Sequence, residues 1–317
     1  MKLFITSSIP EKIYKLLENE FELNYHNSDR SLSEEELIEG AKDADIIFCP
    51  LSDKITANVI NAGKNLKLVA NYGAGFDNID LEAAKEKNVI VTNAPASNSS
   101  TSTAELTAGL IIAAARHIVS GERVLKDGGF YGWKPNYLLG KQLRGKTLGI
   151  IGMGNIGQKV AEIFKAFGME IVYYNRTRLP ELEAKNDYKY MEIDEIIKAS
   201  DVLTIHTAYH KDLHHMIDYK RMKEMKSDAI LVNAARGPLV CESDLIKALN
   251  EGLFYAVALD VYEFEPKYAK ELEQFERVIL CPHLGNATFE AREEMGETAV
   301  SNILAVKNGK EPKNRVC

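Results

Sequence analysis

The amino-acid sequence predicts an α/β protein with two doubly wound domains, each a parallel sheet covered by helices on both faces. Its 317 residues exceed what one ordinary core holds and suit two domains. Short runs rich in Val and Ile alternate with helix-like stretches along both halves of the chain. In the second half, one such run leads directly into a glycine-rich turn that opens a helix. We therefore expect a Rossmann domain and a flavodoxin-like domain.

The candidate strands fall into two groups, one in each half of the chain. Short apolar runs between helix-like stretches are typical of strands that are buried on both faces. In the first half these runs cover residues 2–6, 45–50, 66–72 and 89–94. In the second half they cover residues 147–151, 170–175, 201–206, 229–234, 255–261 and 278–282.

Local signals mark the helices and the domain boundary. A capping box that starts at Ser33 predicts a helix over Glu34–Lys42. The polar, small-residue stretch Asn93–Thr103 is the best candidate for a boundary, and a long helix is expected from Thr103 to Val119. A last helix, expected over Glu290–Asn308, is long enough to return to the first domain.

The composition excludes several classes of partner. Acidic residues outnumber basic ones, 46 to 39, and are spread along the chain, which disfavours nucleic acid. The most apolar helix, Leu106–Ala115, is too short to span a bilayer, and the N-terminus lacks the apolar run of a signal peptide. The four cysteines lie far apart without a CxxC pair, as expected of reduced thiols. We expect a cytoplasmic protein that binds neither nucleic acid nor membrane.

The glycine-rich turn predicts a dinucleotide site, with a purely structural turn as the alternative. The strand at 147–151 runs into the sequence GMGNIG, and a helical pattern follows. In such a unit the glycines form a tight turn, let the backbone approach a pyrophosphate, and pack the helix on the strand. The helix N-terminus adds free N–H groups and a partial positive charge. The candidate cofactor contacts are Gly152, Gly154, Asn155, Ile156 and Gly157.

The end of the next strand indicates which dinucleotide is bound. Sites for NAD place a carboxylate about 20 positions after the turn, where it binds the ribose hydroxyls. Here the strand ends in Asn175, Arg176, Thr177 and Arg178, without a carboxylate. An acidic side chain would repel a 2′-phosphate, whereas two arginines and a hydroxyl would bind it. We predict a preference for NADP(H) over NAD(H); the alternative is that both arginines are solvated loop charges.

Three charged residues follow the last three strand-like runs of the second half. They are Arg236, Glu265 and His283, and the carboxyl ends of parallel strands meet at one edge of a sheet. Reduction of a 2-oxo acid needs a cation for the carboxylate and a proton donor near neutral pH, which suit Arg and His respectively. A carboxylate beside the histidine would favour its charged form. Glu265 is the candidate for this carboxylate, and Glu263 is the alternate. Taken singly, the arginine could be a loop charge and the histidine a helix cap.

The order of motifs resembles that of the D-2-hydroxyacid dehydrogenase family over nearly the whole chain. The motifs are LVANYGAGFDNID (68–80), VTNAP (91–95), AEL (104–106), GKTLGIIGMGNIGQ (145–158), VNAARGPLV (232–240), LDVYEFEP (259–266) and CPHLGNAT (281–288). The resemblance implies that Arg236 binds the substrate, that Glu265 tunes the pKa of the acid/base, and that His283 is this acid/base. It also implies that Asp260 lies near the nicotinamide carboxamide and that Thr103 contacts the cofactor.

Within the family, the sequence is most similar to glyoxylate/hydroxypyruvate reductases, which convert a small 2-oxo acid to the D-2-hydroxy acid. The similarity lies in LSDKIT, VANYGAGFDNID and YNRTR. The implied substrate contacts are Leu51, Ala74 and Gly75, together with Arg236 and His283. Neutral Leu51 stands where phosphoglycerate-type enzymes carry an arginine, which disfavours a phosphorylated substrate.

The resemblance also implies a domain division and an assembly. The substrate-binding domain would comprise residues 1–98 and 286–317, and the dinucleotide-binding domain residues 99–285. Such enzymes are usually homodimers, and residues Thr103–Lys146 would form the contact. Trp133 would then lie near the partner's active site.

Two alternative functions accompany these expectations. The chain could be a D-lactate-type or other 2-oxo acid dehydrogenase, or a non-enzymatic regulator that binds a dinucleotide. A metal site is not expected, because the histidines at 206, 210, 214 and 215 have no acidic or Cys partner at ligand spacing. The segment that begins at His206 lacks the proline of the family's usual His-x-Pro-Leu-Thr pattern, so its role at the cofactor is open.

Overall fold

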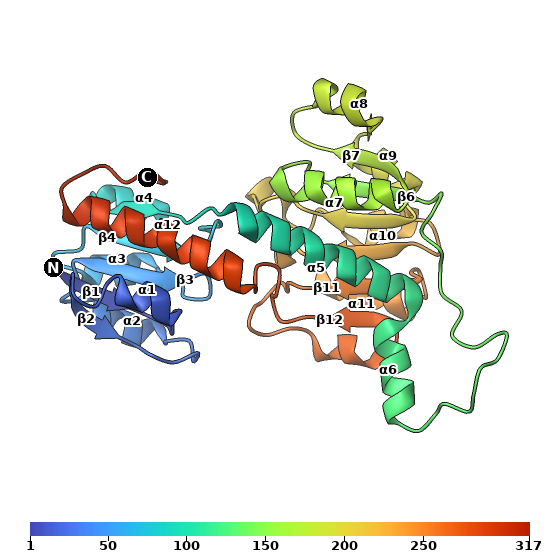
Figure 1. Ribbon diagram of the computed structural model, residues 1–317, viewed down its shortest axis with the longest axis horizontal. Helices are drawn as coiled ribbons and strands as arrows, with labels where there is room; N and C mark the ends of the chain where they lie inside the picture. The colour runs from blue at the N-terminus through green and yellow to red at the C-terminus, as the bar shows by residue number, and fades with distance from the viewer. The chain divides into compact units, whose positions relative to one another are not determined.

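The computed structural model describes all residues from 1 to 317 and divides them into two compact units (Figure 1). Unit 1 consists of Met1–Ser99 and Asn286–Cys317, and unit 2 of Ser100–Gly285. The sequence-based boundary after residue 98 differs from this division by one residue. Each unit holds one parallel sheet with helices on both faces, so the predicted fold class is confirmed.

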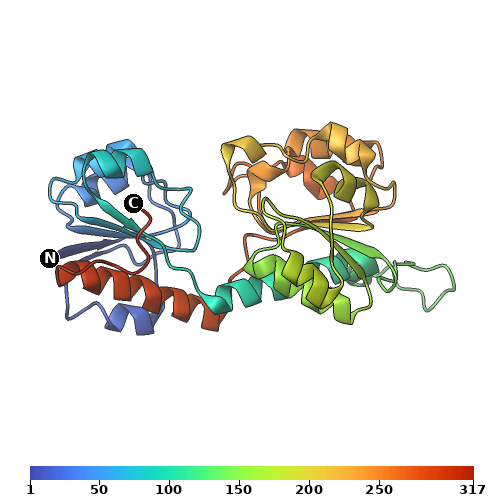
Figure 2. The same ribbon diagram turned by 90° about the horizontal axis from the view of Figure 1, so that it is seen from above.

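The sheet of unit 1 has five parallel strands in the order β2-β1-β3-β4-β5, which is the flavodoxin-like order. The strands are β1 (Lys2–Ile5), β2 (Glu22–Tyr25), β3 (Ile46–Pro50), β4 (Leu68–Tyr72) and β5 (Ile90–Thr92). Three helices cover one face of the sheet and two others the opposite face (Figure 2). Their apolar side chains form a core on each face. The first three are α2 (Glu34–Ala41), α3 (Ala57–Ala62) and α4 (Leu81–Glu86), and the other two are α1 (Glu11–Lys15) and α12 (Phe289–Lys307).

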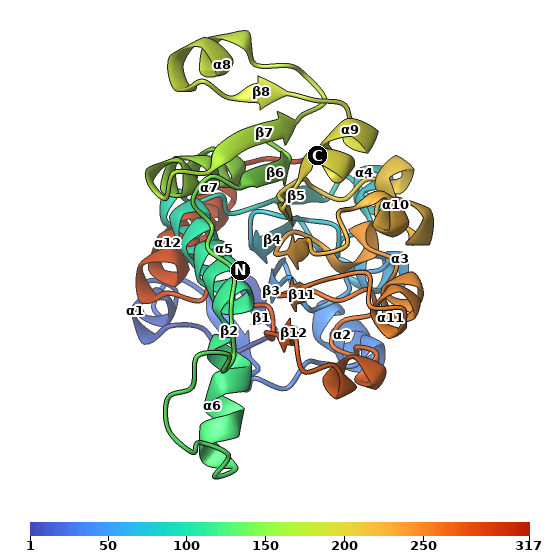
Figure 3. The ribbon, with the colours of Figure 1, turned by 90° about the vertical axis from the view of Figure 1, so that its right-hand side faces the viewer.

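The sheet of unit 2 has seven parallel strands in the order β12-β11-β10-β9-β6-β7-β8, a Rossmann arrangement with one added strand (Figure 3). The strands are β6 (Thr147–Ile151), β7 (Glu170–Tyr174), β8 (Lys189–Tyr190), β9 (Val202–Ile205), β10 (Ile230–Asn233), β11 (Ala256–Leu259) and β12 (Val278–Leu280). The chain order reverses beside β6, which is where ligands bind in open α/β sheets.

Helices cover both faces of this second sheet. Helices α5 and α7 contribute to the core on one face, and α9, α10 and α11 to the core on the other. The helices of the unit are α5 (Ser97–Arg116), α6 (Ile118–Lys126), α7 (Asn155–Ala166), α8 (Pro180–Asn186), α9 (Ile193–Ala199), α10 (Tyr219–Glu224) and α11 (Glu242–Asn250). None of the helices in the structure combines the length and apolar character needed to cross a membrane.

The long helix α5 begins earlier than the sequence predicts, at Ser97 rather than Thr103. Its first turns contain small polar residues that compete with the helix for backbone hydrogen bonds. The carboxylate of Glu294 compensates, because it accepts hydrogen bonds from the amides of Ser97 (3.0 Å) and Asn98 (2.8 Å). A side chain from α12 therefore caps α5, and a cap so distant in sequence leaves no local signal.

An arm, which we define as α6 and residues 127–146, extends away from the sheet of unit 2 (Figures 1 and 3). The arm begins after His117, whose left-handed φ of 57° ends α5. Residues 127–146 form no helix or strand. The arm exposes a set of large apolar side chains, Ile118, Leu125, Phe130, Tyr131, Trp133 and Leu139.

Candidate active site

The glycine-rich turn joins β6 to α7 at the reversal of strand order. Gly152 has a φ of 101°, and a Cβ there would lie 2.6 Å from the carbonyl oxygen of His206. A Cβ on Gly157 would lie 2.1 Å from the carbonyl oxygen of Gly152, so α7 can approach the turn only with a glycine at this position. Gly154 faces open space, and no side chain caps α7. The open glycine and the uncapped N–H groups of the first helical turn fit a pyrophosphate.

The loop after β7 contains the residues expected to select the cofactor. The side chain of Asn175 accepts a hydrogen bond from the Met153 amide (3.3 Å) and donates one to the Thr177 carbonyl (2.9 Å). It therefore connects this loop to the glycine-rich turn. Arg176 and Thr177 are exposed.

Arg178, the other expected phosphate ligand, is engaged by an acid from α8. Its Nε and Nη2 donate to the two carboxylate oxygens of Glu183 at 2.8 and 2.7 Å. The hydroxyl of Tyr173 also donates to Glu183, at 2.8 Å. The hydrogen bond from Arg178 lowers the pKa of Glu183 to about 2, so this carboxylate is charged at neutral pH. The sequence shows no acid at the end of β7, but α8 supplies Glu183, five residues after Arg178.

His283 and Glu265 form a hydrogen-bonded pair. Nδ1 of His283 lies 2.8 Å from Oε2 of Glu265, and the amide of Tyr262 donates to the other carboxylate oxygen at 3.0 Å. Burial by itself would raise the pKa of Glu265, but the hydrogen bond and charge of His283, the Tyr262 amide and the charge of Arg236 bring it below its ordinary value. A carboxylate can only accept, so Nδ1 carries the shared hydrogen and Nε2 remains for proton transfer.

Asp260 fixes the turn that carries His283. The backbone of His283 has a left-handed φ of 55°, and its amide donates to the Asp260 carbonyl at 2.9 Å. The Asp260 carboxylate accepts hydrogen bonds from the amides of Leu284 (2.7 Å) and Gly285 (2.8 Å). Burial raises the pKa of Asp260, against the lowering effect of those amides and of His283. Thr103 packs beside the same turn, since a Cβ on Gly285 would lie 3.3 Å from its side chain.

Arg236 lies in the loop after β10. Its carbonyl accepts a hydrogen bond from the Asn233 side chain (2.9 Å), and its Nη1 donates to the Ala235 carbonyl (2.8 Å). A Cβ on Gly237 would lie 1.8 Å from the carbonyl oxygen of Tyr262, so the loops that carry Arg236 and Glu265 are in direct backbone contact. Only glycine allows this approach.

The three catalytic candidates come from three adjacent strands whose ends are in register. Asn233 of β10 pairs with Leu259 of β11, which pairs with Leu280 of β12. The loops that follow these strands therefore start at the same edge of the sheet in unit 2. The structure brings the arginine, the glutamate and the histidine to this edge.

The loop after β4 in unit 1 presents backbone amides. The carbonyls of Ala74 and Gly75 accept hydrogen bonds from the side chains of Asn93 (2.8 Å) and Asn71 (2.5 Å), and the carbonyl of the preceding glycine from a backbone amide (2.8 Å). The N–H and C=O groups of a trans peptide point in opposite directions. The amides of Ala74 and Gly75 therefore face away from these partners, as an anion-binding nest requires.

Leu51 belongs to the same part of unit 1. A Cβ on Gly73 would lie 2.7 Å from Cγ of Leu51, so the leucine packs directly on the loop after β4. The side chain of Asn78 donates to the carbonyls of Pro50 (3.2 Å) and Asp53 (3.0 Å), and thus holds the two loops together. Asn78 was not among the residues predicted from the sequence, where its only signal is its place in the GAGFDNID motif.

The histidines after β9 have different environments. Nε2 of His206 lies 3.0 Å from the Thr204 hydroxyl, while its buried Nδ1 has no hydrogen-bond partner. Burial lowers the pKa of His206 to about 3, so it is neutral at physiological pH. Nε2 of His215 lies 2.7 Å from Glu263, which the sequence offered as the alternate partner of His283. The two glutamates of the EFEP segment thus pair with different histidines.

The family follows from similarity to known proteins. The family model described as D-isomer specific 2-hydroxyacid dehydrogenase, NAD binding domain, matches residues 108–285. A Staphylococcus aureus protein named as a 2-hydroxyacid dehydrogenase is 43% identical over 98% of both chains. The chain therefore belongs to the D-isomer specific 2-hydroxyacid dehydrogenase family, an oxidoreductase family whose cofactor is a nicotinamide dinucleotide.

Solved structures extend the similarity over the whole chain. A glyoxylate reductase from Paecilomyes thermophila has a TM-score of 0.85 and 32% identity, with coverage of 100% of this chain and 98% of that one. A D-lactate dehydrogenase from Aquifex aeolicus, solved with NAD and lactic acid, has a TM-score of 0.88 and 30% identity over 100% and 99% of the two chains. An NADPH-dependent glyoxylate/hydroxypyruvate reductase from Sinorhizobium meliloti has a TM-score of 0.85 and 25% identity over 100% and 97%.

Proposed function

We propose that this D-2-hydroxyacid dehydrogenase reduces a small 2-oxo acid of the glyoxylate or hydroxypyruvate type to the D-2-hydroxy acid, with NADPH as the preferred reductant. The observation that carries the proposal is the 2.8 Å pair of His283 and Glu265 beside the Arg236 loop. The similarity to two reductases that are named for these substrates supports it.

The residues divide the reaction between them. A bound nicotinamide supplies the hydride that adds to C2 of the substrate. His283 donates a proton from Nε2 to the substrate oxygen, while Glu265 holds the ring by Nδ1 and favours its charged form. Arg236 binds the substrate carboxylate and polarises the carbonyl group.

We assign the remaining substrate contacts to unit 1. The amides of Ala74 and Gly75 bind the carboxylate, because hydrogen bonds to the carbonyls of Gly73 and Ala74, which share peptide planes with these amides, orient them as a nest. Leu51 limits the size of the substrate and offers no charge to a phosphate group. These assignments favour a short, unphosphorylated acid.

The preference for NADPH rests on the loop after β7. Asn175, Arg176, Thr177 and Arg178 provide two cations and two polar side chains where an NAD-specific site carries an acid. Because Arg178 is bound to Glu183, it must exchange this carboxylate for the 2′-phosphate. We therefore propose that Arg176 makes the first contact and that NADH is also accepted.

We further propose that the enzyme is a homodimer that works in the reducing cytoplasm. The arm exposes large apolar side chains, among them Tyr131 (85% exposed) and Trp133 (82% exposed), and such a patch marks an association surface. A second copy of this chain would cover the arm. The four cysteines are free thiols, which supports a reducing compartment.

Initial-rate measurements test the proposal. The purified enzyme would be assayed with glyoxylate, hydroxypyruvate, pyruvate and a branched 2-oxo acid, each with NADPH and with NADH. The highest kcat/KM should belong to glyoxylate or hydroxypyruvate with NADPH. A preference for pyruvate with NADH would instead favour the lactate-type activity, which the similarity to the Aquifex aeolicus enzyme makes the second candidate. Tight dinucleotide binding without turnover of any acid would favour the alternative that the protein is a non-enzymatic regulator.

A further inference from the structure

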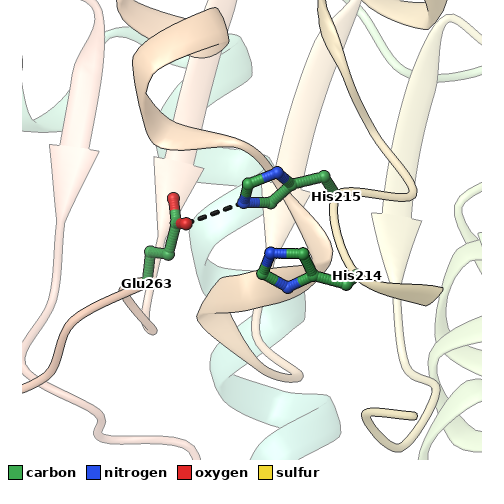
Figure 4. A group of neighbouring side chains, drawn as sticks. All are labelled: His214, His215 and Glu263. Carbon is green, nitrogen blue, oxygen red and sulfur yellow. Dashed lines mark hydrogen bonds and ion pairs between the residues drawn. The ribbon is translucent and has the colours of Figure 1, made fainter. Parts of the chain in front are cut away.

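A cluster of three potential metal ligands lies outside the groups assigned to the reaction. His214, His215 and Glu263 place one ligand atom each within 4.8 Å of one another (Figure 4). We propose that these three side chains bind a divalent transition-metal ion. The sequence indicated no metal site, because no acidic residue lies at ligand spacing from the histidines, yet the fold brings one from 48 residues further along the chain.

The backbone explains how two consecutive histidines serve one site. Side chains of adjacent residues point in different directions in extended and helical chains. His215 adopts a left-handed φ of 54°, and its amide is held by the Pro238 carbonyl at 2.8 Å. As a result the imidazole rings of His214 and His215 stack, with centroids 3.8 Å apart and planes inclined by 25°. Both rings face the carboxylate of Glu263 (Figure 4).

The left-handed conformation is itself informative. A non-glycine residue with this φ is uncommon, and its cost is tolerated where the surrounding structure fixes it. Burial in a core does not offset the conformational cost here, because His214 is exposed and His215 is only half-buried. The hydrogen bond from the His215 amide to the Pro238 carbonyl holds this conformation, and the conformation places both rings on one face.

Each ligand side chain is oriented by a second hydrogen-bonding group. The Glu263 side chain is only 9% exposed, and its Oε2 accepts a hydrogen bond from the Glu242 amide at 3.2 Å. Oε1 is thereby directed to Nε2 of His215 at 2.7 Å. The hydroxyl of Tyr209 lies 3.4 Å from Nδ1 of His214, which leaves Nε2 for the metal. Such outer groups are typical of metal sites, where they fix the orientation of the ligands.

The ligand set selects the class of ion. Two imidazole nitrogens and one carboxylate oxygen suit Zn²⁺, Ni²⁺, Co²⁺ or Cu²⁺ at about 2.0–2.2 Å, whereas Mg²⁺ and Ca²⁺ prefer oxygen ligands. Binding requires the stacked rings to turn apart so that both Nε2 atoms converge on one point. The exposed edge of His214 provides the entry path, and water would complete the coordination.

The location of the site suggests what occupancy would do. His214 and His215 belong to the loop after β9, and Glu263 to the loop after β11 that also carries Glu265. A bound ion would join these two loops more strongly than the single hydrogen bond does. We infer that the metal restricts the motion of the loop that holds the catalytic carboxylate.

Titration of the enzyme with Zn²⁺ tests the proposal. The EDTA-treated full chain, without cofactor or substrate, would be titrated calorimetrically with ZnCl₂, and the visible absorption of bound Co²⁺ would be recorded in parallel. The expected result is one equivalent of metal per chain. His214→Ala and Glu263→Gln should each weaken binding by about tenfold or more. The Co²⁺ spectrum should report nitrogen and oxygen ligands without sulfur.

Two matched variants serve as controls. His210→Ala removes an exposed histidine of the same loop that pairs with Asp212 rather than with the cluster, and His283→Gln removes the other histidine–glutamate pair. Both should retain the metal with unchanged affinity. The proposal is overturned if the wild-type protein binds no Zn²⁺, if the ion survives both His214→Ala and Glu263→Gln, or if His283→Gln abolishes binding. Circular dichroism in EDTA would establish that each variant is folded.

Discussion

Replacement of Glu265 by glutamine probes the proposed proton donor most directly. In the wild type, Nδ1 of His283 lies 2.8 Å from the Glu265 carboxylate. The carbonyl oxygen of a glutamine amide can still accept this hydrogen bond, so the ring should keep its position. What is lost is a negative charge in contact with the imidazole. Because the pKa of Glu265 is below its ordinary value, this charge is present throughout the neutral pH range in the wild-type protein.

The size of the effect follows from the geometry. Exchange of a hydrogen bond to a charged group for one between neutral groups costs roughly 1–1.5 kcal/mol. Both side chains are about one-third exposed, 34% for His283 and 35% for Glu265, and solvent screening places the loss at the lower end of this range. We therefore expect the reduction rate at neutral pH to be about fivefold lower than in the wild type.

Unchanged dinucleotide affinity separates a charge effect from a general loss of structure. Reduction and oxidation share one transition state and one equilibrium constant, so at a given pH Glu265→Gln should lower kcat/KM by the same factor in both directions. The affinities for NADPH and NADP should stay those of the wild type. The assay is kcat/KM in both directions from pH 5 to pH 9 together with dinucleotide binding, with exposed Glu276→Gln as the control. A wild-type rate, or a loss of dinucleotide affinity equal to the loss of rate, would refute the role given to the carboxylate.

Four further predictions address the other parts of the site. His283→Gln should lower kcat by about 10²–10⁴-fold with little change in dinucleotide affinity, and a loss of that affinity would show that the residue is structural instead. Glu183→Gln should release its arginine for the 2′-phosphate and raise the ratio of kcat/KM for NADPH over NADH; an unchanged ratio would remove this loop from cofactor selection. Gly157→Ala should destabilise the protein by about 1–3 kcal/mol in thermal unfolding and weaken dinucleotide binding, because its Cβ would lie 2.1 Å from a carbonyl oxygen. Replacement of Tyr131 and Trp133 by serine should shift the sedimentation coefficient from dimer to monomer, and a wild-type value for the variant would place the interface elsewhere.

The features that sequence analysis predicted are those that follow from the regularity of parallel sheets. Arg236, Glu265 and His283 lie at most six residues beyond the ends of three consecutive strands, and these three strands are neighbours in the sheet. Their placement at one edge needed only the order of the strands. The glycine-rich turn was equally accessible, because the strand, the turn and the helix are contiguous in the sequence.

The features that it missed depend on contacts between distant side chains. The cap that Glu294 provides for α5, and the pairing of His215 with Glu263, join residues that no local pattern relates. The engagement of Arg178 by Glu183 was missed although the two are close in sequence, because the partner lies on the next helix and not at the end of the strand. The periodicity of apolar residues indicates which face of a helix or strand is buried. It does not indicate which distant polar side chains form hydrogen bonds with one another.

The route of the chain through unit 1 has a consequence for how the protein is made. This unit is assembled from both ends of the chain, and unit 2 is inserted between them. Helix α12 covers the apolar face of β4, and the amide of Val316 bonds to the carbonyl of Val91 at 2.7 Å. A ribosome therefore releases residues 1–99 long before the segment that completes their core has been synthesised. We expect unit 2 to fold before unit 1. Until residues 286–317 are synthesised, the apolar strands of residues 1–99 remain exposed and accessible to chaperones.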